Sequence, residues 1–259
     1  MLAYQILGSG KPVIMIHGFP NNHTAWLPQA KILAKEFKVI LPDLYGAGQS
    51  PEYNEGELSI GTMAAGILKI IEKENLEPTV IIGHSMGGYT TIACLEKFPE
   101  KIAGISMVHS LASGDTEEKK EVRKKSILLF NKGEEEKEAF LKGMAKNLFT
   151  PAFASAHPAI VQSIVNNGMQ LSMHALTQYY TAMMHRQDRT EILKTSSVPV
   201  QWIIGAADQT TPTAIALEQC HLASINAVHL YPDVAHMSMM EAPAKLIQDL
   251  SDFCHFCLD

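Results

Sequence analysis

The sequence has few cysteines, no excess of basic residues and no long hydrophobic run. Four cysteines in 259 residues are too few for a disulfide scaffold, so we expect all of them to be reduced: Cys94, Cys220, Cys254 and Cys257. The net charge of −6, with both signs interleaved, argues against nucleic acids and anionic membranes as partners. No run of about 18 apolar residues occurs and the first residues lack a signal-peptide pattern, so we expect a cytoplasmic protein without membrane contact.

Cys254 and Cys257 form a C-x-x-C pattern, which occurs in metal and redox sites. The sequence offers no second cysteine pair that would complete a tetrahedral metal site. The surrounding segment, "LIQDLSDFCHFCLD", carries apolar residues at helical spacing. We therefore expect both cysteines to pack in the core, and we expect neither a metal nor an organic cofactor.

Short apolar runs alternate with helical patterns along most of the chain. Runs such as "VIMI" and "VIIG" are apolar at every position, which indicates strands buried on both faces, as in a parallel sheet covered by helices. The expected strands are 3–7, 13–17, 39–41, 80–83, 104–108, 200–204 and 228–231. The expected helices between them are 24–35, 59–74, 87–97, 213–222 and 243–256. The predicted fold class is α/β, with a mostly parallel central sheet flanked by helices.

The alternation stops between about residues 112 and 196, where the pattern is helical throughout. This region opens with the charge-dense stretch "GDTEEKKEVRKKSILLFNKGEEEKEAF", which we interpret as a solvated helix face with charge pairs four residues apart. It continues with a methionine-rich stretch, "GMQLSMHALTQYYTAMMHRQDRTEIL". The methionines and aromatics there fit either a helix core or the wall of an adaptable apolar pocket, and both interpretations stay open.

The segment "IGHSMGGY" places Ser85 between two glycines, after an apolar run and before a helical pattern. A strand that turns sharply into a helix has no room for side chains at Gly83 and Gly87, and Ser85 would stand at its tip. A serine nucleophile needs a base and an acid that orients the base. Asp208 in "AADQTTP" and His236 in "PDVAHMSMMEAP" each follow a predicted strand, so all three meet at one sheet edge.

Other residues compete for the same roles. His229 and His109 are alternative bases, but the first lies within a strand pattern and the second ends one. Asp233 and Asp115 are alternative acids, and we favour Asp208 because it directly follows a strand. His84, beside the serine, is expected to be a packed neighbour.

Attack on a carbonyl also requires donors for the oxyanion. The backbone N–H of Met86, at a helix start, and that of Phe19, in the loop "IMIHGFPNN", are the expected pair. His17 and Gly18 would shape that loop. Trp26 is expected to pack beneath it or to contribute to the acyl pocket.

The chain resembles the α/β-hydrolase fold superfamily over essentially its whole length. The resemblance is carried by five segments in order: "HGFP" (17–20), "DLYGAGQS" (43–50), "GHSMGG" (83–88), "GAAD" (205–208) and "AHMSMMEAP" (235–243). It implies that the helical region is a cap inserted after the sixth strand. It also implies that four residues of the second segment form a structural turn: Asp43, Gly46, Gly48 and Ser50.

The resemblance is strongest to small carboxylesterases, since Ser85 stands where epoxide hydrolases and haloalkane dehalogenases carry an aspartate. It implies a core of residues 1–110 and 196–259, a cap of residues 111–195, and hydrolysis of a small, mainly apolar ester through an acyl-enzyme. Candidate substrate-binding residues are Trp26, Met173, Tyr179 and Met183. The alternatives are cleavage of a carbon–carbon bond, thioester or lactone, a cofactor-free perhydrolase, and a ligand receptor with a hydrolase pocket; the oligomeric state is open.

Overall fold

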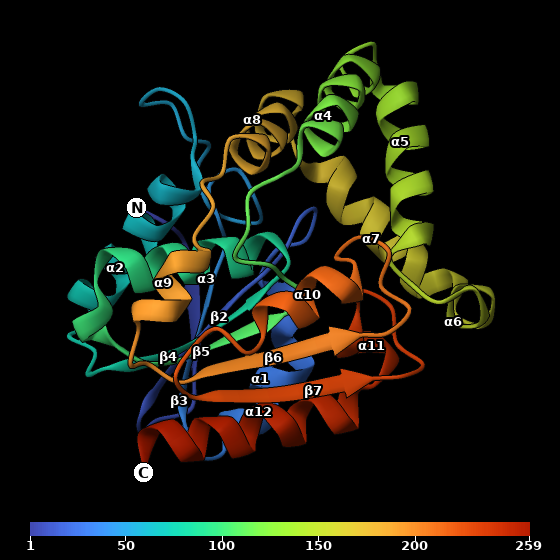
Figure 1. The fold of residues 1–259 in the computed structure, drawn as a ribbon. Coiled ribbons are helices and arrows are strands. Elements are labelled where there is room, and N and C mark those ends of the chain that lie inside the picture. The colour runs from blue at the N-terminus through green and yellow to red at the C-terminus, as the bar shows by residue number, and fades with distance from the viewer.

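A computed structural model describes residues 1–259 and contains one sheet of seven strands (Figure 1). The sheet order is β1-β3-β2-β4-β5-β6-β7. Only β1 runs antiparallel to its neighbour, and every other adjacent pair is parallel. The strands are β1 (Tyr4–Leu7), β2 (Pro12–Ile16), β3 (Lys38–Pro42), β4 (Thr79–His84), β5 (Ile102–Val108), β6 (Val200–Gly205) and β7 (Asn226–Tyr231).

The seven predicted strands are all present, and the predicted α/β class is confirmed. Every residue of β2, β4 and β6 is buried, as their unbroken apolar runs require in a parallel sheet with helices on both faces. The edge strand β7 is only partly buried. The sheet therefore supplies a rigid frame whose parallel strands all end at one edge.

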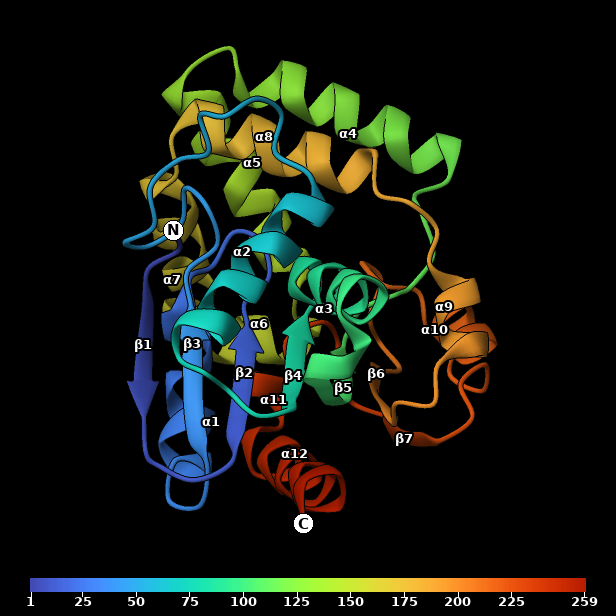
Figure 2. The ribbon, with the colours of Figure 1, turned by 90° about the vertical axis from the view of Figure 1, so that its left-hand side faces the viewer.

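Helices cover both faces of the sheet (Figures 1 and 2). One face carries α1 (Leu27–Leu33) and α12 (Pro243–Leu258), which contact each other. The other carries α2 (Ile60–Lys73), α3 (Met86–Lys97) and α9 (Thr190–Thr195), with α10 (Thr213–Gln219) beside β6. Short 3₁₀ turns span His23–Trp26 and Pro99–Lys101, and α11 (Ser238–Glu241) precedes α12.

The predicted packing role of the C-terminal cysteines agrees with their positions on α12. A Cβ atom on Gly104 of β5 would lie 2.4 Å from Cys257 Sγ, so the glycine lets this helix approach the sheet. All four cysteines are free thiols, and burial raises the pKa of Cys257 to about 12. Among the helices, none combines the length and hydropathy that a bilayer-spanning segment needs.

Five helices lie over the carboxyl ends of the parallel strands (Figures 1 and 2). They are α4 (Glu117–Phe130), α5 (Glu134–Asn147), α6 (Pro151–Ala156), α7 (Pro158–Gln170) and α8 (Met173–Met184). They follow β5, the fifth strand, so the expectation of an insertion after the sixth strand is wrong. One strand fewer precedes these helices than the resemblance implied. The chain segment that contains them still starts at the carboxyl end of a parallel strand, β5.

The charged helix α4 has two different faces. Lys120 and Lys124 pair at the surface with Glu117 and Glu121, three residues before each, as expected of a solvated face. Arg123, on a neighbouring face of the same helix, is buried, so the interpretation of the whole stretch as solvated is wrong. The inner side of α4 therefore carries positive charge where the helix meets the sheet edge.

Candidate active site

Ser85 stands at a sharp corner between β4 and α3. Its φ of 52° lies in the left-handed region, which a residue with a side chain rarely adopts. A Cβ atom on Gly83 would lie 2.3 Å from Thr91 Oγ1, and one on Gly87 would lie 2.4 Å from the carbonyl oxygen of Ile16. Contacts this short exclude a side chain at either glycine. The two glycines thus permit the corner that leaves Ser85 at the carboxyl end of β4.

Hydrogen bonds hold the strained corner from both sides. The N–H of Ser85 donates to the carbonyl oxygen of Val108 at 2.9 Å. The carbonyl oxygen of Ser85 accepts from Ser110 Oγ at 2.8 Å and from the N–H of Gly88 at 2.9 Å. A strained conformation persists where its surroundings over-determine it, and such residues cluster at functional sites.

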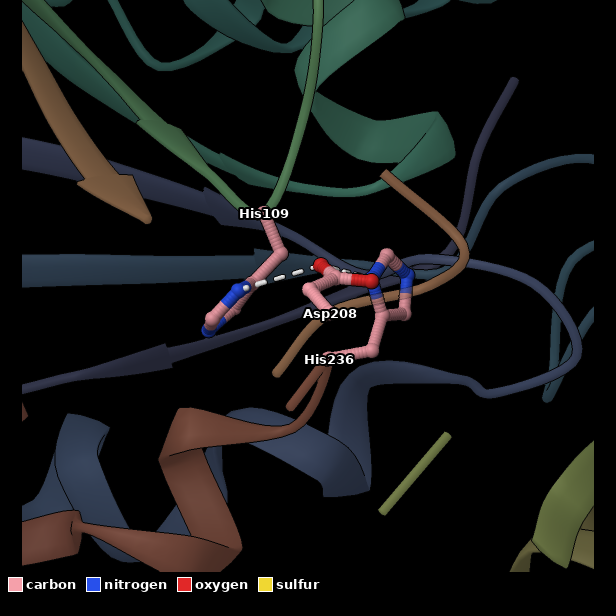
Figure 3. Close-up of side chains that lie close together, drawn as sticks. All are labelled: His109, Asp208 and His236. Atoms are coloured by element: carbon pink, nitrogen blue, oxygen red, sulfur yellow. Dashed lines mark hydrogen bonds and ion pairs between the residues drawn. The ribbon is translucent and has the colours of Figure 1, made fainter. Parts of the chain in front are cut away.

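Asp208 and His236 form a buried pair at the same sheet edge (Figure 3). Asp208 follows β6 and His236 follows β7. His236 Nδ1–H donates to Asp208 Oδ2 at 2.7 Å, while Asp208 Oδ1 accepts the backbone N–H groups of Thr210 at 2.8 Å and Thr211 at 2.9 Å. This leaves His236 Nε2 without a hydrogen-bond partner in the protein. The pair has the tautomer and orientation of a general base held by an acid.

A second imidazole, that of His109, also faces Asp208. Figure 3 shows the two histidines on either side of the carboxylate. His109 Nε2 accepts the N–H of Ser238 at 3.3 Å, so the ring proton is on Nδ1. The distance from Nδ1 to Asp208 Oδ2 is 3.4 Å. This distance exceeds an ordinary hydrogen bond, and we treat the contact as electrostatic. From the sequence, His109 was only an alternative base, because the sequence does not show which side chains at neighbouring strand ends contact each other.

The electrostatics of this cluster keep Asp208 ionised. Burial alone would raise its pKa, but His236 and His109 hold the pKa of Asp208 well below its usual range. Burial also lowers the pKa of His109, which keeps that ring neutral near pH 7. The cluster therefore carries one fixed negative charge beside His236.

These three side chains are also the group closest to a metal-ligand set, because their candidate ligand atoms lie within 4.8 Å of one another. Their hydrogen bonds account for the arrangement. His236 Nδ1 and His109 Nδ1 both carry protons, and the oxygens of Asp208 face four N–H groups. A metal ligand must offer a lone pair to the ion, and these atoms are engaged as donors or acceptors already.

The position of His109 gives a test of its contact with Asp208. Replacing His109 by phenylalanine removes one N–H from the carboxylate, and we expect kcat/KM of a reaction in which His236 acts as the base to fall about 2–10-fold, the typical value of one polar contact. The pH profile separates this effect from a packing defect, because a less stabilised carboxylate should move the acid limb of kcat/KM. His229→Phe, on the partly exposed part of β7, is the matched control. An unchanged profile in His109→Phe would contradict the assignment.

Ser85 and His236 line one pocket of about 220 Å³, at the boundary between the sheet edge and the overlying helices. Half of its twelve lining residues are hydrophobic: Phe19, Tyr89, Met144, Leu148, Tyr180 and Met183. The alternative residues lie elsewhere. Asp115 is paired with two arginines, Asp233 is exposed, and His229 lies on the outer edge strand. His109 also faces Asp208, but of the candidate bases only His236 both lies within hydrogen-bond distance of Asp208 and lines the pocket with Ser85.

Two backbone donors flank the serine. The N–H groups of Phe19 and Met86 have no hydrogen-bond partner in the protein, and Met86 is the first residue of α3, where helical N–H groups are free. A Cβ atom on Gly18 would lie 3.0 Å from Ser85 Cβ, so the loop that carries Phe19 lies against the corner. The helix dipole adds positive potential at Met86.

The sequence matches the family model of the alpha/beta hydrolase fold over residues 11–243. The chain belongs to this family. An esterase from Thermogutta terrifontis, solved with malate bound, superposes on this α/β hydrolase with a TM-score of 0.93 and 26% identity, covering 100% of this chain and 94% of that one. Lipase 3 of a Moraxella species is 24% identical over 95% of this chain and 78% of its own.

An uncharacterised protein of Mycobacterium tuberculosis is 34% identical over 106 residues, which are 41% of this chain and 31% of that protein. The match thus spans less than a third of that relative's length. The likeness to it is confined to those 106 residues and carries no statement about substrate.

Buried polar contacts organise the loops around the α/β-hydrolase corner. His17 Nε2 accepts the N–H of Leu44 at 3.0 Å, and its Nδ1–H donates to the carbonyl oxygen of Gly18 at 3.0 Å. His84 Nε2–H donates to the carbonyl oxygen of His236 at 2.9 Å, which agrees with its expected role as a packed neighbour. These bonds hold in place the loop that carries Phe19 and the loop after β7 that carries His236.

The D-x-x-G-x-G-x-S segment has the architectural role that the resemblance implied. Asp43 Oδ2 accepts the N–H of Gln49 at 2.9 Å, and Ser50 Oγ donates to the carbonyl oxygen of Asp43 at 2.6 Å. A Cβ atom on Gly48, whose φ is 52°, would lie 2.2 Å from the Asp43 carboxylate, and Gly46 also has a positive φ of 83°. The segment closes on itself and does not reach the pocket.

Of the four predicted substrate-binding residues, the pocket wall contains Met183. Trp26 is fully buried and its Nε1–H donates to the carbonyl oxygen of Ile16, so it packs beneath the loop instead. Tyr179 is buried in the core, and Met173 is the first residue of α8, about three turns before Met183. Trp26, Tyr179 and Met173 are thus not among the residues that line this pocket. Tyr180 lines the pocket in place of Tyr179, because one residue along a helix turns a side chain by about 100°.

Proposed function

We propose that this protein is a serine hydrolase that cleaves small carboxylic esters through an acyl-enzyme. The observation that carries the proposal is that Ser85, at a strained corner, shares one pocket with His236, which is bonded to a buried ionised Asp208. The esterase and lipase among its relatives support the same reaction class.

In the first half of the proposed reaction, Ser85 Oγ attacks the ester carbonyl carbon while His236 Nε2 takes its proton. The carbonyl oxygen becomes an oxyanion, which the N–H groups of Phe19 and Met86 stabilise. Asp208 stabilises the His236 cation that forms. The tetrahedral intermediate then collapses, the alkoxide takes the proton from His236 Nε2, and the alcohol leaves an acyl group on Ser85.

In the second half, His236 Nε2 removes a proton from water, and the hydroxyl oxygen attacks the acyl carbon. Collapse of the second intermediate releases the carboxylic acid and returns the proton to Ser85 Oγ. All proton transfers are made by one imidazole, so the free enzyme is regenerated without a cofactor.

We propose that residues 111–195 act as the cap over this site and set its specificity. The helices α4, α5 and α8 each contribute side chains to the pocket wall, and the N–H of His236 donates to the carbonyl oxygen of Leu148 at the end of α5. The substrate is a small molecule, because about 220 Å³ is below the usual range for drug-sized ligands. The apolar side of the wall suits a short acyl chain.

The test is rapid-mixing hydrolysis of p-nitrophenyl esters from acetate to decanoate. We expect a p-nitrophenolate burst equal to the enzyme concentration, followed by slower turnover, with the highest kcat/KM at a short acyl chain. A burst without turnover would favour a ligand receptor that retains the pocket. If no ester reacts and a fluorophosphonate does not label Ser85, the proposed function is wrong.

A further inference from the structure

The pocket around Ser85 is not lined by apolar groups alone. Lys119 and Arg123, one turn apart on α4, form part of its wall. Positions four residues apart lie on the same face of a helix, and two like charges there repel each other. No acidic side chain lies among the lining residues of this pocket.

Arg123 has donors that the protein does not use. Its Nε–H donates to Asp115 Oδ2 at 2.5 Å. Neither of its terminal Nη groups has a hydrogen-bond partner in the protein, and neither group is completely buried. The two free Nη groups form the planar fork that binds a carboxylate through both oxygens.

Arg123 is not needed to neutralise Asp115. Arg186 already binds the other oxygen of that carboxylate at 2.5 Å, and its remaining bonds go to the carbonyl oxygens of Ser113 and Met183. Asp115 therefore has a second cationic partner, Arg186, which does not line the pocket. The positive charge of Arg123 is in excess beside the pocket.

Lys119, unlike Arg123, forms no ion pair with an acidic side chain. Its Nζ donates to the carbonyl oxygen of Thr210 at 2.9 Å, which uses one of three donors. Burial alone would raise the pKa of Tyr89, a third residue of this wall, but Arg186, Lys119 and Arg123 lower it. Two cationic side chains and no acidic one therefore line the pocket, although the chain as a whole carries −6.

We propose that the substrate is an ester whose acyl chain ends in a carboxylate, and that Arg123 and Lys119 bind this carboxylate while Ser85 attacks the ester. This inference rests on the proposed function and names its substrate class. The apolar residues Met144, Leu148 and Met183 contact the methylene groups between the two ends. The expectation of a mainly apolar acyl group therefore applies only to the part of the pocket that these three residues line.

The test compares monoethyl glutarate with ethyl glutaramate, which replaces the carboxylate by an amide of the same shape. We expect the wild type to favour the carboxylate by about 10–100-fold in kcat/KM, the usual effect of hydrogen bonds to a charged group. Lys119→Gln and Arg123→Gln should each lower this ratio at least about fivefold. Higher salt should also lower it in the wild type, because salt screens charge but not shape.

Lys124→Gln is the matched control, since Lys124 lies next to Arg123 on α4 but pairs with Glu121 at the surface. Its ratio should equal that of the wild type. If Arg123→Gln fails to fold because Asp115 loses a partner, Lys119→Gln carries the test alone. A wild-type ratio near 1, or one that both variants leave unchanged, overturns this inference.

The two proposals fail in different ways. An enzyme that hydrolyses p-nitrophenyl butyrate but shows no preference for the carboxylate retains the proposed function and loses the anionic subsite. An enzyme that cleaves no ester in either series, and is not labelled at Ser85, loses the proposed function itself.

Discussion

Ser85→Ala is expected to lower kcat for every ester substrate by about 10⁴–10⁶-fold, the largest effect of any single substitution in this protein. The alanine removes the oxygen that forms the acyl-enzyme, and no neighbouring hydroxyl can replace it, because Ser110 Oγ is bonded to the carbonyl oxygen of Ser85. The residual rate should come from the oxyanion donors and binding alone. Steady-state hydrolysis and the p-nitrophenolate burst both measure the loss.

The combined variant sharpens this prediction. Because Ser85 and His236 act in one step, Ser85→Ala/His236→Ala should be about as inactive as Ser85→Ala alone. Ser163→Ala, an exposed serine on α7, is the matched control and should keep the wild-type rate. Losses that multiply in the double variant would show that the two residues act independently, which contradicts the proposed mechanism.

Asp208→Asn is expected to lower kcat by about 10⁴-fold while the fold is retained. The amide is nearly isosteric, but it loses the negative charge that stabilises the His236 cation and its NH₂ group favours the wrong imidazole tautomer. Asp233→Asn is the matched control, because Asp233 is exposed in the loop between β7 and His236. Equal activity losses in the two variants would reject the assignment of the acid.

The pH dependence of stability gives Asp208 a second signature. A carboxyl group whose pKa is lowered by folding stabilises the native state above its unfolded pKa of about 3.9, and this contribution is lost as the pH falls toward the native pKa. The difference in unfolding free energy between wild type and Asp208→Asn should therefore be constant near neutral pH and shrink below about pH 4. Chemical denaturation at pH 7, 5, 4 and 3 measures it. A difference that grows on acidification would contradict the lowered pKa of Asp208.

Much of the fold could be predicted because the signals are local. The unbroken apolar runs specify strands buried on both faces, and the predicted strands match β1 to β7. The count of strands before the helical region was wrong, since it was taken from the resemblance and not from the runs themselves. The bounds of the five overlying helices could not be predicted, because polar and methionine-rich helices fit several packings.

The candidate site divides in the same way. Ser85 could be located because the tight corner leaves no room for a side chain at the glycines on either side of it, and the structure shows which atoms a Cβ would meet there. Asp208 and His236 could be placed because both follow strands, and parallel strands end at one edge. His109 follows a strand too, yet its contact with Asp208 depends on side-chain rotation and could not be inferred.

The sequence by itself determined the corner at Ser85, the order of the residues that follow the strands and the α/β class, because each depends on local sterics or on unbroken apolar runs. Only the tertiary structure decided which side of α4 and α8 faces the pocket. A helix turns about 100° per residue, so its inward face depends on what it packs against. That packing directs Tyr180 instead of Tyr179, and Lys119 and Arg123 instead of Lys120 and Lys124, toward the serine.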